Sequence, residues 1–174
     1  VSVNFSRTQF ELPDAKNRLE AALAEAGIPA CRLQLEITET TVMADPDRAN
    51  MLLDELRSLG IEIAMDDFGT GYSSLGCLRS FPFDRLKIDR AFIQDLTTSL
   101  EARAILSMIV RLANTLGMHT TAEGVETAEQ LAIVKEEGCS AVQGFFFSPA
   151  KPARDVLAFL QQPIDRISSA TGKG

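Results

Sequence analysis

Oxygen-bearing side chains recur at the ends of apolar, strand-like segments in this 174-residue chain. The stretch EIAMDDFGTGYSSL, residues 62–75, places two adjacent aspartates after an apolar run and before a glycine-rich loop. Carboxylates together with an amide oxygen are the ligand set of Mg²⁺ or Mn²⁺. Mutual repulsion among several acids is tolerable when cations lie between them, and a metal pair ~3.5–4 Å apart supports in-line displacement at phosphorus. The predicted metal ligands are Asn4, Glu36, Asp66, Asp67 and Glu123.

Lys87 is the cation expected on the same face as these acids. Its ammonium could orient an attacking water and help to neutralise charge that develops on a phosphoryl group. Two other roles stay open: an ion pair with Glu or Asp inside the protein, and a Schiff-base lysine of the aldolase type. A dense set of carboxylates would keep the lysine protonated, which disfavours the Schiff base.

Strand-like and helix-like segments alternate along the chain and must position these residues. The helix that begins at Asp45–Pro46 has an N-cap residue followed by proline at the first helical position. A longer helix over 100–116 carries Ile105, Ile109, Leu112 and Leu116 on one stripe. The predicted strands are VSVNF, RLQLEI, IEIAMD, RLKID, HTTAE and a short run near 144–147. The other predicted helices are 13–27, 75–80 and one behind each of the last two strands.

These elements form six strand–helix units, so 174 residues divided by six gives 29 residues per unit. Such units build a parallel sheet covered by helices. A closed TIM barrel needs eight units and typically ~250 residues. The sequence therefore predicts an α/β, TIM-barrel-like fold with about six of eight units present: one domain over 1–163 and a flexible tail over 164–174.

Period-2 alternation within the strands separates an apolar face from a polar face. An antiparallel sheet with one wet face would give the same alternation. The intervening helices favour a parallel sheet instead, because crossover helices cover its outer face. The polar face then lines the interior near the carboxyl ends of the strands, where active sites of this architecture lie.

Composition excludes several classes of protein. The net charge of −7 disfavours nonspecific binding to nucleic acid polymers. His119 is the single histidine and is expected at the start of its strand, in a structural role. The three cysteines form no CxxC pair and fit a reducing compartment. No apolar run reaches the ~18–20 residues that span a bilayer, and the FFF at 145–147 is expected mainly in the core, although one ring could face a base.

Several motifs together closely resemble the EAL domain, the bacterial phosphodiesterase of cyclic di-GMP. They occur in order over about residues 1–160 as VSVNFS, LQLEITET, DDFGTGYSSLGCLRSFPFDRLKIDRAF, TAEGVET and QGFFFSPA. The resemblance implies a modified TIM barrel in the cytoplasm that hydrolyses cyclic di-GMP to linear pGpG with two Mg²⁺ or Mn²⁺ ions. Ca²⁺ is expected to bind and to inhibit, because its looser coordination places the water poorly.

The resemblance also assigns roles to single residues. It makes Asp66 the bridge between the metals, Lys87 the residue that holds the nucleophilic water, and Gln143 a member of the metal and water shell. Glu39 resembles the glutamate that braces the DDFGTGYSS loop, which in this family couples metal binding to dimer contacts. An acid at the start of a helix is the alternative role of Glu39.

One departure from the family pattern concerns the Glu-Ala-Leu signature. LEAALAEAG at 19–27 imitates it but lies in a predicted helix. We therefore expect the signature strand, with one more metal ligand, in sequence upstream of Val1, together with a sensory or GGDEF domain; a membrane anchor there is compatible with the pattern. A catalytically inactive receptor for cyclic di-GMP is the alternative function if that upstream glutamate is missing.

Overall fold

A computed structural model describes residues 1–69 and 75–161. It divides into two compact units, which are Val1–Ile88 with Leu112–Thr120 and Asp89–Arg111 with Thr121–Gly174. The expected tail over 164–174, and with it the boundary at 163, lies outside the described residues. The same is true of positions 70–74 in the glycine-rich loop.

The elements alternate as the sequence predicts, and the strands are hydrogen-bonded in chain order. The strands are β1 (Ser2–Asn4), β2 (Gln34–Thr38), β3 (Glu62–Phe68), β4 (Arg85–Ile88), β5 (His119–Ala122) and β6 (Ala141–Val142). The helices are α1 (Arg7–Phe10), α2 (Ala15–Ala26), α3 (Glu39–Met43), α4 (Pro46–Ser58), α5 (Leu75–Ser80), α6 (Leu100–Thr115), α7 (Ala128–Glu136) and α8 (Ala153–Leu160). Two 3₁₀ turns, η1 (Ala30–Arg32) and η2 (Arg90–Phe92), complete the described elements.

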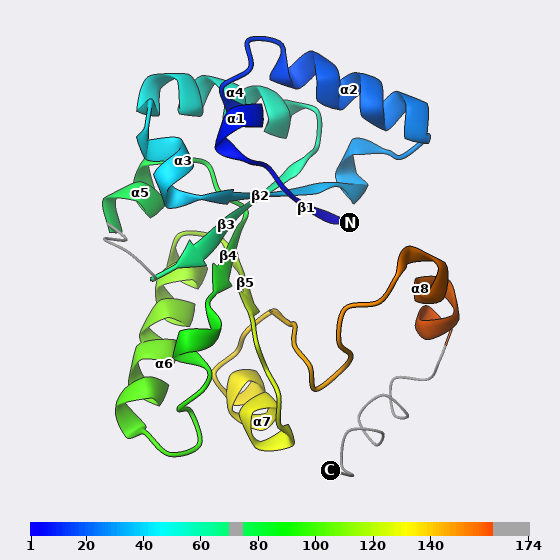
Figure 1. Ribbon diagram of the computed structural model, residues 1–174. Coiled ribbons are helices and arrows are strands. Elements are labelled where there is room, and N and C mark those ends of the chain that lie inside the picture. The colour runs from blue at the N-terminus through cyan, green and yellow to red at the C-terminus, as the bar shows by residue number, and fades with distance from the viewer. Residues whose placement is uncertain (70–74, 162–174) are drawn as a thin grey trace. The chain divides into compact units, whose positions relative to one another are not determined.

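The first unit is built on β1–β4, in which neighbouring strands run parallel. Register places Asn4 opposite Glu36, and Thr38 opposite Asp66. Figure 1 shows α2 and α4 side by side on one side of β1–β3, and they also contact each other. Parallel strands in chain order with helices between them confirm the predicted α/β fold class.

Alternation along β2, β3 and β4 buries the apolar face, as predicted. Leu35, Ile37, Ile63, Met65 and Leu86 are at most 1% exposed. The polar face of the same strands carries the candidate site residues. In β1 the rule is weaker, since Val3 stays 45% exposed.

The ends of α4 follow the predicted signals. Asp45 caps the helix by accepting a hydrogen bond from the backbone N–H of Arg48 at 3.2 Å, and Pro46 is the first helical residue. The apolar residues Leu52, Leu53 and Leu56 are buried on one side of the helix. Capping and one-sided burial together explain why this segment is helical.

The predicted apolar stripe of α6 is partly wrong. Ile109 is buried, but Ile105 and Leu116 are 39% and 40% exposed. The buried side chains of the helix are instead Leu106, Ile109, Val110 and Ala113. A shift of one position in the chosen stripe rotates the predicted face by about 100°.

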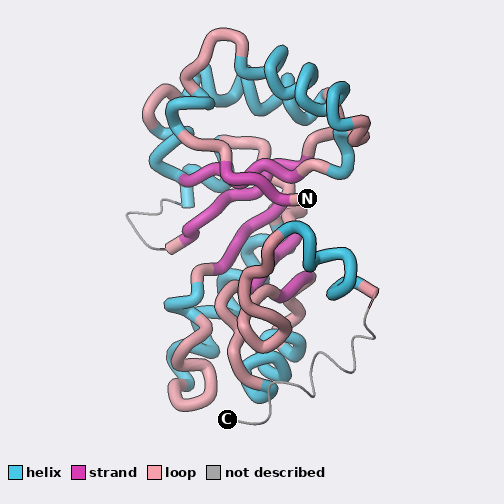
Figure 2. The backbone as a smooth tube through the Cα atoms, turned by 45° about the vertical axis from the view of Figure 1, so that its right-hand side comes forward, coloured by secondary structure: helices cyan, strands magenta, loops and turns pink. Residues whose placement is uncertain are grey.

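The strand predicted near 144–147 is also misplaced. The strand is Ala141–Val142, which pairs with Thr121 and Ala122 of β5. Residues 144–147 form a turn, and Figure 2 shows that the segment between β6 and α8 is loop. The apolar FFF gives a strand-like pattern, but Phe146 is buried here by the turn rather than by strand pairing.

Over residues 1–69 and 75–161, none of the helices combines the length and the apolar character needed to cross a bilayer.

Candidate active site

Lys87 lies between two of the predicted acids in the first unit. Its Nζ donates to Glu36 Oε2 at 2.6 Å and to Asp66 Oδ1 at 2.8 Å. The side chains of Lys87, Glu36 and Asp66 are 7%, 11% and 14% exposed, respectively. The residues come from adjacent strands β4, β2 and β3, so the sheet brings together groups 51 and 21 positions apart. Charge-assisted hydrogen bonds of this length fix the ammonium in one position.

A β-bulge accommodates two consecutive aspartates near the end of β3. Met65 pairs with Leu86, and Phe68 pairs with Ile88. Two residues of β3, Asp66 and Asp67, therefore lie opposite the single residue Lys87 of β4. Met65 and Phe68 are both buried, although they are three positions apart. The bulge thus interrupts strict alternation and places an acidic pair at the carboxyl end of a buried strand.

Asp67 has an unusual backbone conformation at this bulge. Its φ is 55°, and it is the one described non-glycine residue with positive φ. Aspartate and asparagine tolerate this left-handed region better than other L-residues. Asp67 is exposed, next to Asp66, whose side chain is largely buried.

The remaining predicted residues of the first unit lie at the expected ends of their strands. Asn4 is the last residue of β1 and pairs in register with Glu36. Glu39 is the first residue of α3, directly after β2. Burial raises the pKa of the Cys77 thiol, and the Glu39 carboxylate is the second cause. An acid in a first turn favours its helix, and the loop that Glu39 was predicted to brace includes the undescribed positions 70–74.

Glu123 and Gln143 belong to the second unit and line one cavity of about 440 Å³. Glu123 follows β5 directly, and Gln143 follows β6. Their segments are joined by backbone hydrogen bonds: Gln143 N donates to Ala122 O at 2.8 Å, and Val125 N donates to Gln143 O at 3.1 Å. The other lining residues are Asp89, Arg90, Gly124, Glu126, Gly144, Phe145, Ser148, Pro149 and Ala150.

Two glycines allow the walls of this cavity to approach closely. A Cβ on Gly124 would lie 2.4 Å from Arg90 Cβ, and Gly124 has a φ of +69°. A Cβ on Gly144 would lie 2.1 Å from the carbonyl oxygen of Val125. Neither position can hold a side chain without displacing its neighbours. Steric crowding therefore explains why AEGVE and QGFFF have glycine at these positions.

Sequence reasoning missed the contribution of Arg90 to this cavity. It follows Lys87 by three residues in η2, where no periodic pattern indicates which way a side chain points. Phe145, in contrast, is 61% exposed at the cavity, whereas Phe146 is 7% exposed. One ring of the FFF thus stays accessible, although the run was expected mainly in the core, and Phe146 packs edge-to-face against Phe147.

Each unit, taken by itself, has oxygen donors of the kind that a hard divalent cation prefers. Asn4, Glu36, Asp66 and Asp67 offer oxygen atoms in or next to strands of the first unit, and Glu123 offers them in the second. Within the described residues, however, no three His, Cys, Asp or Glu side chains gather as a group able to hold a metal. In the first unit, Glu36 and Asp66 instead share the ammonium of Lys87. The predicted ligand set therefore stays a prediction.

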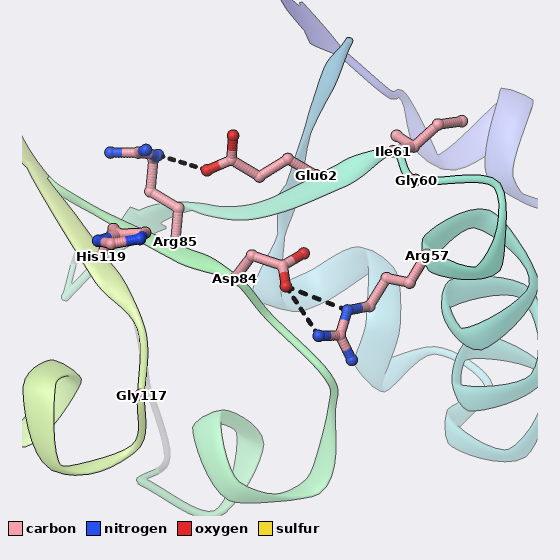
Figure 3. A pocket seen from close by; sticks show the side chains of 8 residues that line it. All are labelled: Arg57, Gly60, Ile61, Glu62, Asp84, Arg85, Gly117 and His119. Atoms are coloured by element: carbon pink, nitrogen blue, oxygen red, sulfur yellow. Dashed lines mark hydrogen bonds and ion pairs between the residues drawn. The ribbon is translucent and has the colours of Figure 1, made fainter. Parts of the chain in front are cut away.

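A second cavity, of about 690 Å³, lies at the other ends of the strands (Figure 3). Asp84 Oδ1 accepts from Arg57 Nη2 at 2.8 Å, and Arg85 Nε donates to Glu62 Oε1 at 2.8 Å. His119 lines the same cavity at the start of β5, as predicted, but it is exposed. The acidic and basic side chains of this cavity pair with one another. In barrels of this kind, residues at the amino ends of the strands usually serve stability rather than chemistry.

Comparisons with known proteins agree on one family. The family model described as "EAL domain" matches residues 1–150. The cyclic di-GMP phosphodiesterase NbdA of Pseudomonas aeruginosa is 42% identical over 161 residues, which are 92% of this chain and 21% of that protein. The bifunctional diguanylate cyclase/cyclic di-GMP phosphodiesterase MucR of the same organism is 40% identical over 158 residues, or 91% of this chain and 23% of that protein. The chain thus spans about a fifth of the length of these relatives.

A solved structure agrees with this assignment. The structure entitled "PaMucR Phosphodiesterase, c-di-GMP complex" has a TM-score of 0.82 and 40% identity, and the match covers 89% of this chain and 63% of that one. Klebsiella pneumoniae BlrP1, in a manganese/cy-diGMP complex, has a TM-score of 0.79 and 36% identity over 85% of this chain and 38% of that one. A second structure of BlrP1, a calcium/cy-diGMP complex, has also been solved.

Proposed function

The chain belongs to the EAL domain family, and we propose from this premise that its intact protein hydrolyses cyclic di-GMP to linear pGpG. The observation that carries the proposal is Lys87 of β4 held by Glu36 of β2 and Asp66 of β3. An ammonium fixed in this way has a defined position from which to bind a reacting oxygen. The named relatives and the complexes with cyclic di-GMP support the substrate.

We assign Lys87 the role of holding the attacking water. The water oxygen forms a bond to phosphorus while the bond from phosphorus to the 3′ oxygen breaks; the water gives up a proton and the 3′ oxygen gains one. Asn4, Glu36, Asp66, Asp67 and Glu123 would hold two Mg²⁺ or Mn²⁺ ions, with Gln143 completing the shell. When bound, these ions supply the positive charge that in-line displacement at a phosphodiester requires. The manganese complex of BlrP1 supports the metal class.

Calcium should occupy the same ligands and inhibit turnover. Ca²⁺ accepts 6–8 oxygen ligands at longer and more variable distances than Mg²⁺. The resulting geometry positions the reacting groups poorly. The calcium complex of BlrP1 with cyclic di-GMP supports occupancy by this ion.

We further propose a homodimer with a sensory or GGDEF domain upstream, acting in the cytoplasm. The bifunctional name of MucR supports an attached cyclase domain. Three cysteines without a disulfide among the described residues are compatible with a reducing compartment. Light scattering of the full-length protein tests the dimer: a monomer mass at all concentrations refutes it.

The decisive experiment measures pGpG release by the full-length protein with Mg²⁺ and compares it with Asp66→Asn. The substitution keeps the shape of the side chain but removes the charge beside Lys87, and we expect turnover to fall about 10²-fold or more. Asp54→Asn, in an exposed position of α4, is the matched control and should keep normal turnover. Near-normal rates in the Asp66 variant refute the site; saturable binding of cyclic di-GMP by the wild type without turnover supports the receptor function instead.

A further inference from the structure

A buried glutamine joins two loops of the second unit. Gln130, in the first turn of α7, is 7% exposed. Its Oε1 accepts from the backbone N–H of Glu126 at 2.8 Å and of Thr127 at 3.1 Å. Its Nε2 donates to the carbonyl oxygens of Ile93 at 3.3 Å and Gln94 at 3.5 Å. The Gln130 amide thus contacts its own helix start and a segment 37 residues earlier in the sequence.

The two loops are walls of the cavity that contains Glu123. The loop after β4 contributes Asp89 and Arg90, and the loop after β5 contributes Glu123 and Gly124. They touch where Gly124 passes Arg90, since a Cβ at Gly124 would lie 2.4 Å from Arg90 Cβ. The distance between the loops is therefore constrained at two places, by this contact and by the Gln130 amide.

Helix capping explains only half of the contacts of Gln130. Its Oε1 and the side chain of Thr127 form a capping box, in which Thr127 Oγ1 accepts from Gln130 N at 3.1 Å. A glutamate would serve this box equally well and would also favour the positive end of the helix dipole. The Nε2 group, which glutamate lacks, is what reaches Ile93 and Gln94. A carboxylate there would face carbonyl oxygens without a proton to donate.

A chain of contacts continues from Gln94 to the cavity. With its amide oxygen directed toward Arg90, the Gln94 side chain accepts from Arg90 Nη2 at 2.6 Å and from Nε at 3.0 Å. The backbone of Gln94 therefore accepts a hydrogen bond from Gln130, while its side chain binds the guanidinium of Arg90, a residue that lines the cavity. Displacement of residues 93 and 94 would move Arg90 as well.

We propose that Gln130 is a positioning residue, which fixes the loop carrying Glu123 against the loop carrying Asp89 and Arg90. The inference rests on the proposed function, because it makes the location of the Glu123 carboxylate, a predicted metal ligand, depend on the Nε2 bonds. Loss of partners that orient a metal ligand typically weakens metal binding 10–100-fold. Gln130 itself is not among the residues that line the cavity, and it contacts neither metal nor substrate in this scheme.

The test compares Gln130→Glu with Thr127→Ala in the full-length protein. The first variant keeps the acceptors of the capping box and loses the Nε2 donor, whereas the second loses the hydroxyl cap and keeps the amide bridge. Electron paramagnetic resonance of free Mn²⁺, without substrate, gives the dissociation constant. We expect it to rise about tenfold in Gln130→Glu and to stay unchanged in Thr127→Ala, although both variants should melt at lower temperature. Gln130→Met, which removes both sets of bonds, should weaken Mn²⁺ binding at least as much and serves if the charged variant fails to fold.

Kinetics with cyclic di-GMP provide a second readout. A positioning role predicts that added Mn²⁺ restores part of kcat in Gln130→Glu, whereas a merely structural role leaves no such dependence. Equal Mn²⁺ affinity in Gln130→Glu and the wild type, or an equal loss in Thr127→Ala, overturns the inference while the proposed function stands. A wild-type protein that neither binds Mn²⁺ nor releases pGpG overturns the proposed function and this inference with it.

Discussion

Lys87 donates to Glu36 at 2.6 Å and to Asp66 at 2.8 Å from a position that is 7% exposed. One cation therefore stabilises two carboxylates, one on β2 and one on β3. Removal of one partner of a buried ion pair costs about 3–5 kcal/mol, because the remaining charges are left uncompensated. The ammonium thus supports the fold of the first unit as well as any chemistry at the site.

We predict that Lys87→Met lowers the free energy of unfolding of the metal-free protein by about 3 kcal/mol. We also predict that Mg²⁺ or Mn²⁺ raises the thermal midpoint more in this variant than in the wild type, since a divalent cation can replace the missing charge between the acids. Calorimetry with and without metal measures both effects. Lys135→Met, in an exposed position of α7, is the control and should change neither quantity. Equal metal-induced shifts in Lys87→Met and the wild type contradict the prediction.

The sequence was sufficient to predict the parallel α/β order and the strand-end positions of the candidate residues. Those features depend on local periodicity and on the rule that crossover helices make strands parallel. The bulge at Asp66 and Asp67 could not be predicted, because it is defined by register against Leu86 and Ile88 in another strand. The 144–147 run shows the opposite error: an apolar pattern alone does not distinguish a strand from a buried turn.

Other parts of the site depend on contacts between distant segments. Gln130 is recognisable in the sequence as the N3 residue of a capping box that begins at Thr127, but its contact with Ile93 depends on how two loops pack. The approach of Gly124 to Arg90 is equally invisible to local pattern. The buried stripe of α6 was misassigned at Ile105 and Leu116 because several apolar residues of this helix could form the stripe.

Asp67 offers a matched test of backbone strain at the bulge. Its φ of 55° is readily adopted by glycine but costs an L-residue with a Cβ about 1–2 kcal/mol. We therefore expect Asp67→Gly to be more stable than Asp67→Ala by about 1 kcal/mol, although both variants lose the same carboxylate. Urea unfolding of the two variants gives the difference. An alanine variant at least as stable as the glycine variant would show that the bulge relaxes or that strain is absent.

Asp84 should contribute more to stability than the arginine with which it pairs. Its Oδ1 accepts from Arg57, whose side chain is 42% exposed, whereas its Oδ2 accepts from the backbone N–H of buried Ile63 at 2.9 Å. Exposed ion pairs contribute about 0–1 kcal/mol, but a buried N–H left without its acceptor costs about 1–3 kcal/mol. We expect Arg57→Ala to cost at most about 1 kcal/mol and Asp84→Ala about 2–3 kcal/mol in urea unfolding. A larger cost for Arg57→Ala than for Asp84→Ala would mean that the ion pair, not the backbone contact, dominates.

The Cys77 thiol should make the free energy of unfolding depend on pH in the alkaline range. Burial, with the Glu39 carboxylate as the second cause, raises the pKa of this thiol to about 12, whereas an unfolded cysteine titrates near ~8.5. The unfolded state therefore loses its proton first, so the stability present below pH ~8.5 declines as the pH rises toward 12, by at most about 1.4 kcal/mol per pH unit from this group.

The measurement that checks this is the free energy of unfolding between pH 8 and 10.5 for the wild type, Cys77→Ala and Cys31→Ala. Cys77→Ala should be less stable at neutral pH, because the substitution leaves a cavity, but it should lose less stability on going to pH 10.5. Cys31 is exposed, so its variant should follow the wild type. In the folded protein at pH 8, iodoacetamide should also alkylate Cys31 well before Cys77, since the reactive thiolate of Cys77 is both rare and buried. Parallel pH profiles for all three proteins, or early alkylation of Cys77, would show that the thiol is not held neutral against Glu39.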